Sequence, residues 1–134
     1  MPGEERVELV TPGGRWEADP TPGMVREQAI GVEGLWAGLV RTGAHVASGW
    51  HHHGDHETAI YVVEGTLRME FGPSGEDVLE AGPGDFLRVP RNVVHRETNS
   101  GDRESRIVVV RSGNGPTTVN VASPTSPGTG GSFG

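Results

Sequence analysis

The chain has 134 residues, a formal net charge of −7 and no cysteine. Its 11 basic residues are all arginine, so the chain also lacks lysine. This composition excludes cysteine nucleophiles, disulfides, cysteine metal sites and Schiff-base chemistry on lysine. The length suits one domain. The acidic balance predicts no nucleic-acid partner, because a phosphate-binding surface needs clustered basic residues.

The sequence carries no signal for a membrane or for export. No apolar run approaches the roughly 20 residues that a membrane-spanning helix needs. Residues 1–6 lack the basic and apolar pattern of a signal peptide. We therefore expect no membrane partner and a cytoplasmic location.

The distribution of turn residues divides the chain into three regions. Residues 1–23 hold several of the 22 glycines and 10 prolines, which predicts an N-terminal arm that is mostly loop. Residues 24–111 alternate short apolar runs with glycines, which predicts a barrel of short strands. Residues 112–134 form a C-terminal segment, and its Ser-, Pro- and Gly-rich composition predicts disorder from about residue 123.

Alternation of apolar and polar residues identifies the clearest strand, at residues 66–71. There Leu67, Met69 and Phe71 share one face, and polar residues occupy the other. We expect strands at residues 25–32, 34–41, 44–50, 58–64, 66–72, 76–80, 85–90, 93–98 and 104–111. No segment carries a sustained helical repeat. The sequence thus predicts an all-β fold, an antiparallel barrel or sandwich with little or no helix.

The histidines are the main candidates for functional residues, and four of the six lie between residues 49 and 57. On a strand, residues two apart point to the same side, so His51 and His53 can offer two imidazoles to one ion while His52 faces away. Glu57 follows closely and can add a carboxylate. His95 would supply a further imidazole from a strand that folds back alongside.

Imidazole and carboxylate ligands suit a divalent transition metal ion, namely Fe, Mn, Ni, Zn or Cu. Four protein ligands around an octahedral ion leave two positions for water, dioxygen or a small-molecule substrate. A histidine-rich loop also occurs as a polar surface turn or as an adventitious metal binder. A lone histidine such as His95 is commonly a hydrogen-bonded structural residue. A metal site is expected only because His95 and the pair His51 and His53 occur in the same chain.

The segment around His95 resembles the second motif of the cupin superfamily. That motif runs Gly, five residues, Pro-x-Gly, two residues, His, three residues, Asn. This chain matches it at Gly84, Pro90, His95 and Asn99, with Asn92 in place of the middle glycine. The replacement is mild, because asparagine is the non-glycine residue that best tolerates positive φ.

The earlier segment resembles the first cupin motif. That motif runs Gly, five residues, His-x-His, three or four residues, Glu, six residues, Gly. The match is at His51, His53, Glu57 and Gly65, whereas His45 stands where the leading glycine is expected. The resemblance covers about residues 24–111. It implies a double-stranded β-helix, or jelly-roll barrel, with a metal site inside near one mouth.

The spacing of the first motif leaves the fourth ligand open. Seven residues, 58–64, separate Glu57 from Gly65, one more than in the family pattern. Counting back from Gly65 puts Thr58 in the ligand register, and a one-residue slip turns a side chain to the opposite face. The fourth ligand is therefore Glu57 if the preceding turn shifts it inward, or His56, which shares parity with Thr58. The third alternative is a site of three histidines alone.

The resemblance is compatible with three classes of function, each with a small-molecule ligand. The first is a mononuclear-metal enzyme, an oxidoreductase of the dioxygenase type. The second is a non-redox isomerase, lyase or decarboxylase acting on a small sugar or oxo-acid. The third is a binding or sensing module without turnover. Exposed strand edges and the arm of residues 1–23 also predict a homodimer formed by strand exchange or sheet extension.

Overall fold

The computed structural model describes residues 5–18, 21–115 and 118–124. Apart from one turn of 3-10 helix at Pro12–Gly14, its regular elements are all strands. The strands are β1 (Trp16–Glu17), β2 (Met24–Val32), β3 (Leu35–Thr42), β4 (His51–His52), β5 (Thr58–Glu64), β6 (Leu67–Phe71), β7 (Asp77–Ala81), β8 (Phe86–Val89), β9 (His95–Thr98), β10 (Ser105–Ser112) and β11 (Val119–Asn120). Within the described residues, no helix is long and apolar enough to cross a bilayer.

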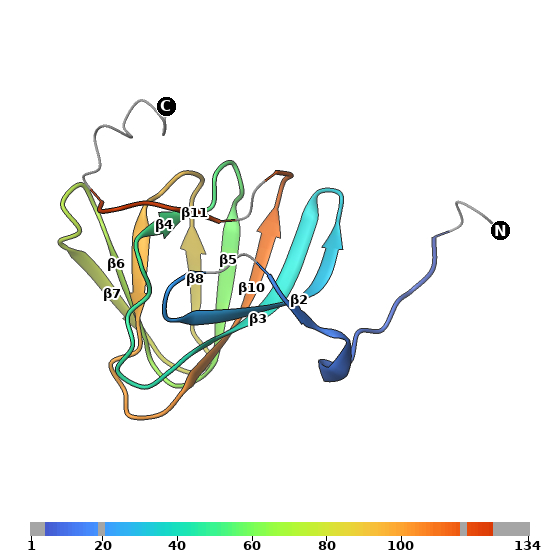
Figure 1. Cartoon of the computed structure of the whole chain (residues 1–134), viewed down its shortest axis with the longest axis horizontal. Helices are drawn as coiled ribbons and strands as arrows, with labels where there is room; N and C mark the ends of the chain where they lie inside the picture. The colour runs from blue at the N-terminus through green and yellow to red at the C-terminus, as the bar shows by residue number, and fades with distance from the viewer. Residues whose placement is uncertain (1–4, 19–20, 116–117, 125–134) are drawn as a thin grey trace.

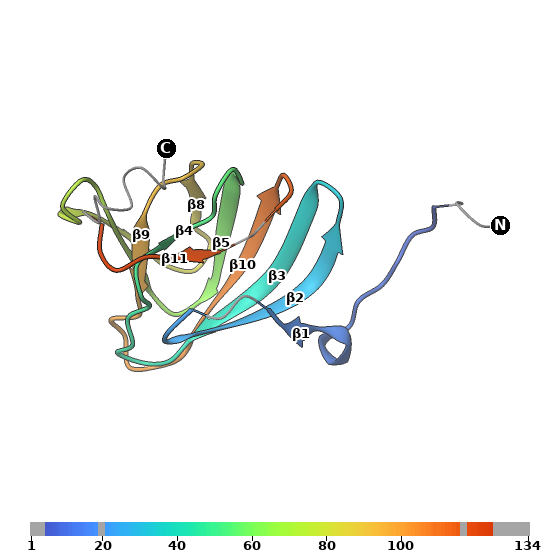
Figure 2. The same ribbon diagram turned by 45° about the horizontal axis from the view of Figure 1, so that its top comes forward.

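The strands form two antiparallel sheets that face each other (Figures 1 and 2). One sheet has the order β1-β2-β3-β10-β5-β8, and the other has the order β11-β4-β9-β6-β7. The chain crosses between the sheets repeatedly, so that β4 and β9 each lie in the sheet opposite to the strands that precede and follow them in sequence. This arrangement confirms the predicted all-β double-stranded β-helix.

Every second side chain of the long strands points inward and packs in the space between the two sheets. In β5 and β10, every second residue is buried, beginning with Thr58 and Ser105, and the residues between them face outward. Burial of apolar side chains is the main favourable contribution to folding. The apolar core consists of Met24, Trp36, Val40, Ile60, Val62, Leu67, Met69, Ala81, Val89, Ile107 and Val109. The same interior also holds buried polar side chains, which form the candidate site described below.

The prediction of a strand at residues 44–50 is wrong. There the backbone makes a single isolated bridge, from Ala47 to Thr98, and the strand forms later, at β4. The physical reason is a turn, in which Val46 donates a backbone hydrogen bond to Gly43 and His45 adopts a φ of 59°. An extended strand cannot contain a residue in this left-handed region.

Two residues that replace family glycines keep the conformation of glycine. The described non-glycine residues with positive φ are His45, at 59°, and Asn92, at 60°. Asn92 also joins the two motifs, because its backbone N–H donates to Gly54 O at 2.8 Å and its side-chain amide donates to Asp55 at 3.2 Å. The departures from the family pattern therefore preserve the turns that orient the histidine segments.

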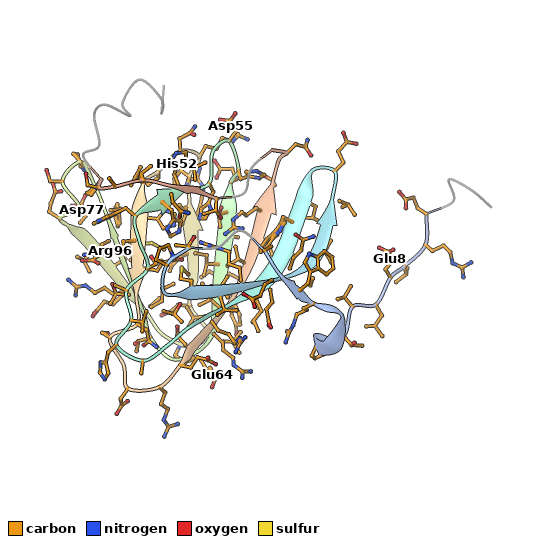
Figure 3. All side chains as sticks on the ribbon, in the orientation of Figure 1. Glu8, His52, Asp55, Glu64, Asp77 and Arg96 are labelled. Carbon is orange, nitrogen blue, oxygen red and sulfur yellow. The ribbon has the colours of Figure 1, made fainter. Side chains whose placement is uncertain are left out.

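The two ends of the chain differ in their contact with the sheets. The described part of the N-terminal segment extends away from the barrel, as the position of Glu8 in Figure 3 shows, and then pairs with β2 through β1. Near the other end, β11 pairs with β4, which aligns Val119 with His52 and Asn120 with His51. Most of the tail predicted to be disordered, residues 125–134, lies outside the described residues.

Candidate metal centre

The structure brings His51, His53 and His95 together inside the barrel. One ring nitrogen of each lies within 4.8 Å of those of the other two, and all three residues are buried. Their ring centroids are separated by 4.3 to 5.1 Å. The antiparallel pairing of β4 with β9 produces this cluster, because it places His51 directly opposite His95.

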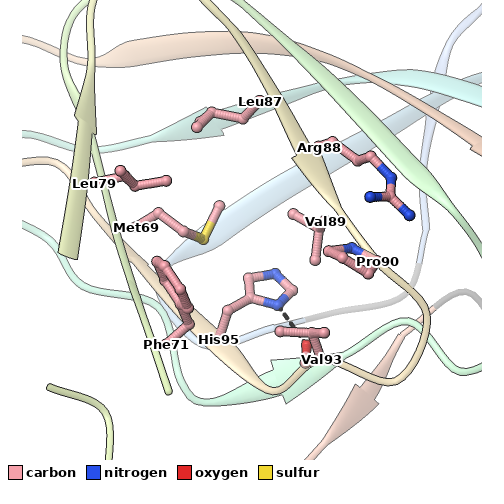
Figure 4. A pocket seen from close by; sticks show the side chains of 9 residues that line it. All are labelled: Met69, Phe71, Leu79, Leu87, Arg88, Val89, Pro90, Val93 and His95. Carbon is pink, nitrogen blue, oxygen red and sulfur yellow. Dashed lines mark hydrogen bonds between the residues drawn. The ribbon is translucent and has the colours of Figure 1, made fainter. Parts of the chain in front are cut away.

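Hydrogen bonds to the backbone fix the orientation of two of these rings. His51 Nδ1 lies 2.9 Å from Gly49 O, and His95 Nδ1 lies 2.9 Å from Val93 O, a contact drawn in Figure 4. A carbonyl oxygen only accepts, so each Nδ1 carries the proton and donates it. In a neutral ring the lone pair is then on Nε2, which is the arrangement found in metal-ligating histidines.

The environment of His95 keeps its imidazole neutral. Burial lowers the pKa of His95 to about 3, and the electrostatic effect of His51 acts in the same direction, while the Glu97 carboxylate opposes it. The His95 Nε2 atom is buried and has no hydrogen-bond partner in the described structure. A buried acceptor without a partner is costly and calls for an explanation, and a ligand at this position would provide one.

A buried carboxylate, that of Glu97, lies beside the histidines and was not predicted from the sequence. Glu97 follows His95 by two residues on β9, so both side chains point into the barrel. Its Oε2 lies 3.4 Å from His51 Nε2. Burial alone would raise the pKa of Glu97, but His51, His95 and Arg26 lower it to about 2, so the side chain is ionised at neutral pH. The signal that could have found it was the alternation of the predicted strand at residues 93–98.

Two buried arginines were also missed. Arg26 on β2 is 2% exposed, and its Nη2 lies 3.4 Å from His51 Nε2. Its other terminal nitrogen donates to the Thr21 hydroxyl. Arg111 on β10 is equally buried, and its guanidinium lies 4.6 Å from the centre of the Trp36 ring. The interior thus offers positive charge close to the three imidazoles.

Glu57 is placed apart from the three imidazoles. Its carboxylate accepts a hydrogen bond from Arg88 Nε at 2.9 Å and lies 3.9 Å from Arg91, at the protein surface. The bond from Arg88 lowers the pKa of Glu57, and the arginine charges add to this effect against a smaller opposing effect of burial. Thr58 is the buried residue of this pair, as the register counted back from Gly65 predicts. The turn therefore does not shift Glu57 inward, which was the condition for its role as a ligand.

His56 is buried but lies in a different environment. Its Nδ1 is 2.6 Å from Ser112 O, and its Nε2 is 3.2 Å from Gly115 O. Both nitrogens contact carbonyl oxygens, so the ring joins the loop before β5 to the residues that follow β10. These contacts describe a structural histidine. Of the three alternatives for the ligand set, the observed grouping matches the site of three histidines.

A mainly apolar pocket reaches the cluster from one side (Figure 4). His95 forms part of its wall, and Arg88 contributes the guanidinium seen beside Pro90. The pocket has a cavity volume of about 70 Å³ and is partly open to solvent. Its walls are formed by Met69, Phe71, Leu79, Leu87, Arg88, Val89, Pro90, Val93 and His95. A small, largely apolar molecule bound here would contact the imidazole of His95.

Solved structures with the same fold include proteins of varied activity. The polyketide cyclase RemF from Streptomyces resistomycificus has a TM-score of 0.71 at 20% identity, covering 92% of this chain and 94% of that one. KdgF from Halomonas sp. has a TM-score of 0.67 at 20% identity, covering 81% and 96%. Oxalate decarboxylase from Bacillus subtilis has a TM-score of 0.66 at 19% identity, covering 76% of this chain and 28% of that one. Similarity at this level shows the fold alone.

Sequence comparison identifies the family. A stretch of 47 residues is 40% identical to the uncharacterized protein YdbB of Bacillus subtilis (strain 168), which covers 35% of this chain and 40% of that relative. The chain therefore matches less than half the length of this curated relative. The model of the cupin domain matches residues 39–111, which include both histidine segments. With this match and the double-stranded β-helix, the chain belongs to the cupin domain family.

Proposed function

We propose that this cupin is a mononuclear-metal enzyme that acts on a small molecule. His51, His53 and His95 would hold a divalent transition metal ion, one of Fe, Mn, Ni, Zn or Cu. The observation that carries the proposal is the buried cluster of three imidazoles, in which the Nε2 of His95 has no hydrogen-bond partner among the described residues. Nitrogen donors of this kind fit such ions, and the chain has no cysteine thiolate to compete.

The surroundings of the cluster favour a small, largely apolar substrate with an anionic group. The pocket beside His95 is lined mainly by apolar side chains. The guanidinium of Arg26 approaches the cluster from the interior, and that of Arg88 lies at the pocket. Guanidinium groups pair well with carboxylates and phosphates, so these residues would orient the anionic end of the substrate.

A dioxygenase-type oxidation is the reaction that we propose first. When bound, the metal would supply open coordination positions for substrate and dioxygen. The apolar pocket walls would exclude water from the reacting atoms, and His95, held by Val93 O, would keep the site rigid. A non-redox isomerase, lyase or decarboxylase is the second candidate, and the shared fold with a cyclase and a decarboxylase supports it.

Metal-loaded protein offered small carboxylic acids will separate these classes. We expect protein loaded with Fe²⁺ to consume oxygen with at least one member of a panel of small aromatic and aliphatic acids, measured with an oxygen electrode. Product formation without oxygen uptake, detected by chromatography, would support the non-redox class instead. Thermal stabilisation by an acid without any product would support a binding module. If no acid produces any of these signals, the proposed function is wrong.

We also propose that two copies of the chain associate through the outer face of the six-stranded sheet. Strand registers align Leu39, Val108, Tyr61 and Phe86 across β3, β10, β5 and β8 on the side away from the core. Phe86 is 75% exposed and packs its ring against Tyr61 at 4.8 Å. Tyr61 and Phe86 are exposed, and Leu39 and Val108 are half-buried. A continuous apolar surface of this kind marks an interaction site, and two-fold pairs are the commonest homo-oligomers.

Replacing Phe86 with glutamate is expected to separate such a pair, because a charged side chain would be buried in an apolar contact. Light scattering after size exclusion should give the mass of two chains for the unchanged protein and of one chain for Phe86→Glu. Val78→Glu, on β7 of the other sheet, is the matched control and should keep the larger mass. A single-chain mass for the unchanged protein contradicts this proposal.

A further inference from the structure

We infer that Glu97 is a ligand of the metal centre, the carboxylate partner of the three histidines. The inference rests on the proposed metal site and goes beyond it, because neither the motif spacing nor the histidine cluster includes Glu97. Among the described residues, Glu97 is the one acidic side chain that is buried. Thr58 occupies the ligand position that is found by counting back from Gly65, but it has no carboxylate. Glu57 is held at the surface by Arg88.

The position of the carboxylate fits a shared ion. Glu97 Oε2 lies 3.4 Å from His51 Nε2 and has no hydrogen-bond partner in the described structure. This separation exceeds the range of about 2.7–3.2 Å for a good hydrogen bond. Ligand atoms at about 2.0–2.2 Å from one ion lie about 3 Å apart at an octahedral angle and about 3.4 Å apart at a tetrahedral angle. These two atoms are therefore spaced as neighbouring ligands are. The described group of ligand atoms within 4.8 Å of one another contains the three histidines and not Glu97, so an ion shared by all four residues requires the Glu97 side chain to move toward the cluster.

The backbone holds Glu97 in place beside the cluster. Its N–H donates to Ser48 Oγ at 3.0 Å, and its carbonyl accepts from Ser48 N–H at 2.7 Å. On its other side, β9 pairs with β6, which aligns Glu97 with Met69. A strand that is fixed on both sides holds the Cα–Cβ bond of Glu97 toward the interior, and metal sites need such support from the backbone.

A competing role for Glu97 is to balance the charge of Arg26. The positive charge of Arg26 contributes to lowering the pKa of Glu97, so the two side chains attract each other whether or not a metal binds. The two roles differ in what they predict. A carboxylate that only balances Arg26 affects the stability of the metal-free protein, whereas a ligand also changes the affinity and the coordination spectrum of the bound ion.

Binding of Co²⁺ to chelator-treated protein tests the inference. The visible absorption of Co²⁺ reports the number and kind of its ligands, and a titration reports its affinity. We expect Glu97→Gln to weaken Co²⁺ binding about tenfold or more and to change the spectrum. The spectrum decides between the two roles, because residues outside the ligand set have effects of this size on affinity, so weaker binding with an unchanged spectrum would contradict the inference. Glu57→Gln is the matched control, because it removes the carboxylate that the motif spacing suggests, and it should leave both readouts unchanged.

Glu97→Asp covers the case in which Glu97→Gln does not fold. It keeps the negative charge near Arg26 but withdraws the oxygen from the ion by one methylene group, so it should also weaken Co²⁺ binding. If a folded Glu97 variant binds Co²⁺ with unchanged affinity and spectrum, Glu97 is not a ligand and the three-histidine site stands. If the unchanged protein does not bind Co²⁺ at all, the proposed metal centre itself is wrong.

Discussion

Replacing His95 with alanine is expected to abolish stoichiometric metal binding. The substitution removes one of the three clustered imidazoles, the one whose buried Nε2 has no hydrogen-bond partner in the part of the chain that the structure describes. The remaining rings, His51 and His53, come from one short segment and cannot enclose an ion from opposite sides. Elemental analysis after dialysis should show the metal content of His95→Ala falling from about one ion per chain to a trace level.

His56→Ala is the control for this experiment, because His56 is also a buried histidine but contacts the carbonyl oxygens of Ser112 and Gly115. We expect this variant to melt at a lower temperature and to keep its metal. The comparison separates a general loss of packing from the loss of a ligand. A folded His95→Ala protein that still retains one ion per chain would refute the assignment of His95.

Replacing Asn99 with alanine is expected to destabilise the barrel by about 3 kcal/mol. Asn99 is 1% exposed, and its amide donates to three backbone carbonyl oxygens, those of Thr42, Gly43 and Arg103, at 2.6 to 3.2 Å. Its Oδ1 accepts from Gly101 N–H at 3.0 Å. Alanine leaves these groups without their partner, and an unsatisfied buried group costs about 1–3 kcal/mol. Urea unfolding followed by circular dichroism measures the change.

Two further substitutions show which property of Asn99 matters. Asn99→Asp has nearly the same shape but turns an acceptor toward three carbonyl oxygens, so it should destabilise at least as much as alanine. Asn114→Ala removes an exposed asparagine that accepts from Gly34 N–H and should cost less than about 1 kcal/mol. If Asn99→Ala unfolds at the same urea concentration as the unchanged protein, Asn99, the last residue of the second cupin motif, does not stabilise the fold. The hydrogen bonds assigned to its side chain would then be wrong.

Most of the fold could be predicted from the sequence, because period-two alternation and turn glycines reflect local geometry. The strands predicted at residues 66–72 and 104–111 correspond to β6 and β10. The failure at residues 44–50 has a specific cause. Those residues look extended, but the turn at His45 requires a left-handed backbone, which is set by contacts such as His45 N–H to Gly101 O rather than by local preference.

The candidate site was predictable only in part. Spacing along one strand relates His51 to His53, and the second motif relates both to His95, so the sequence was sufficient for the cluster that the structure assembles. Charged residues on strands usually face solvent, so Arg26 gave no sign of its burial. For Glu97 the sign was its position two residues after His95 on one predicted strand, which places both side chains on the same face. That this face points into the barrel depends on how the two sheets close around the interior.

The central claim is that three imidazoles, two from β4 and the residue after it and one from β9, share one ion. Elemental analysis of untagged protein tests this claim most directly. The protein, purified without added metal and then dialysed against trace Fe²⁺, Mn²⁺, Ni²⁺, Zn²⁺ or Cu²⁺, should retain about one ion per chain of at least one of these metals. Protein that retains none of them, while circular dichroism shows an intact β fold, would contradict the account.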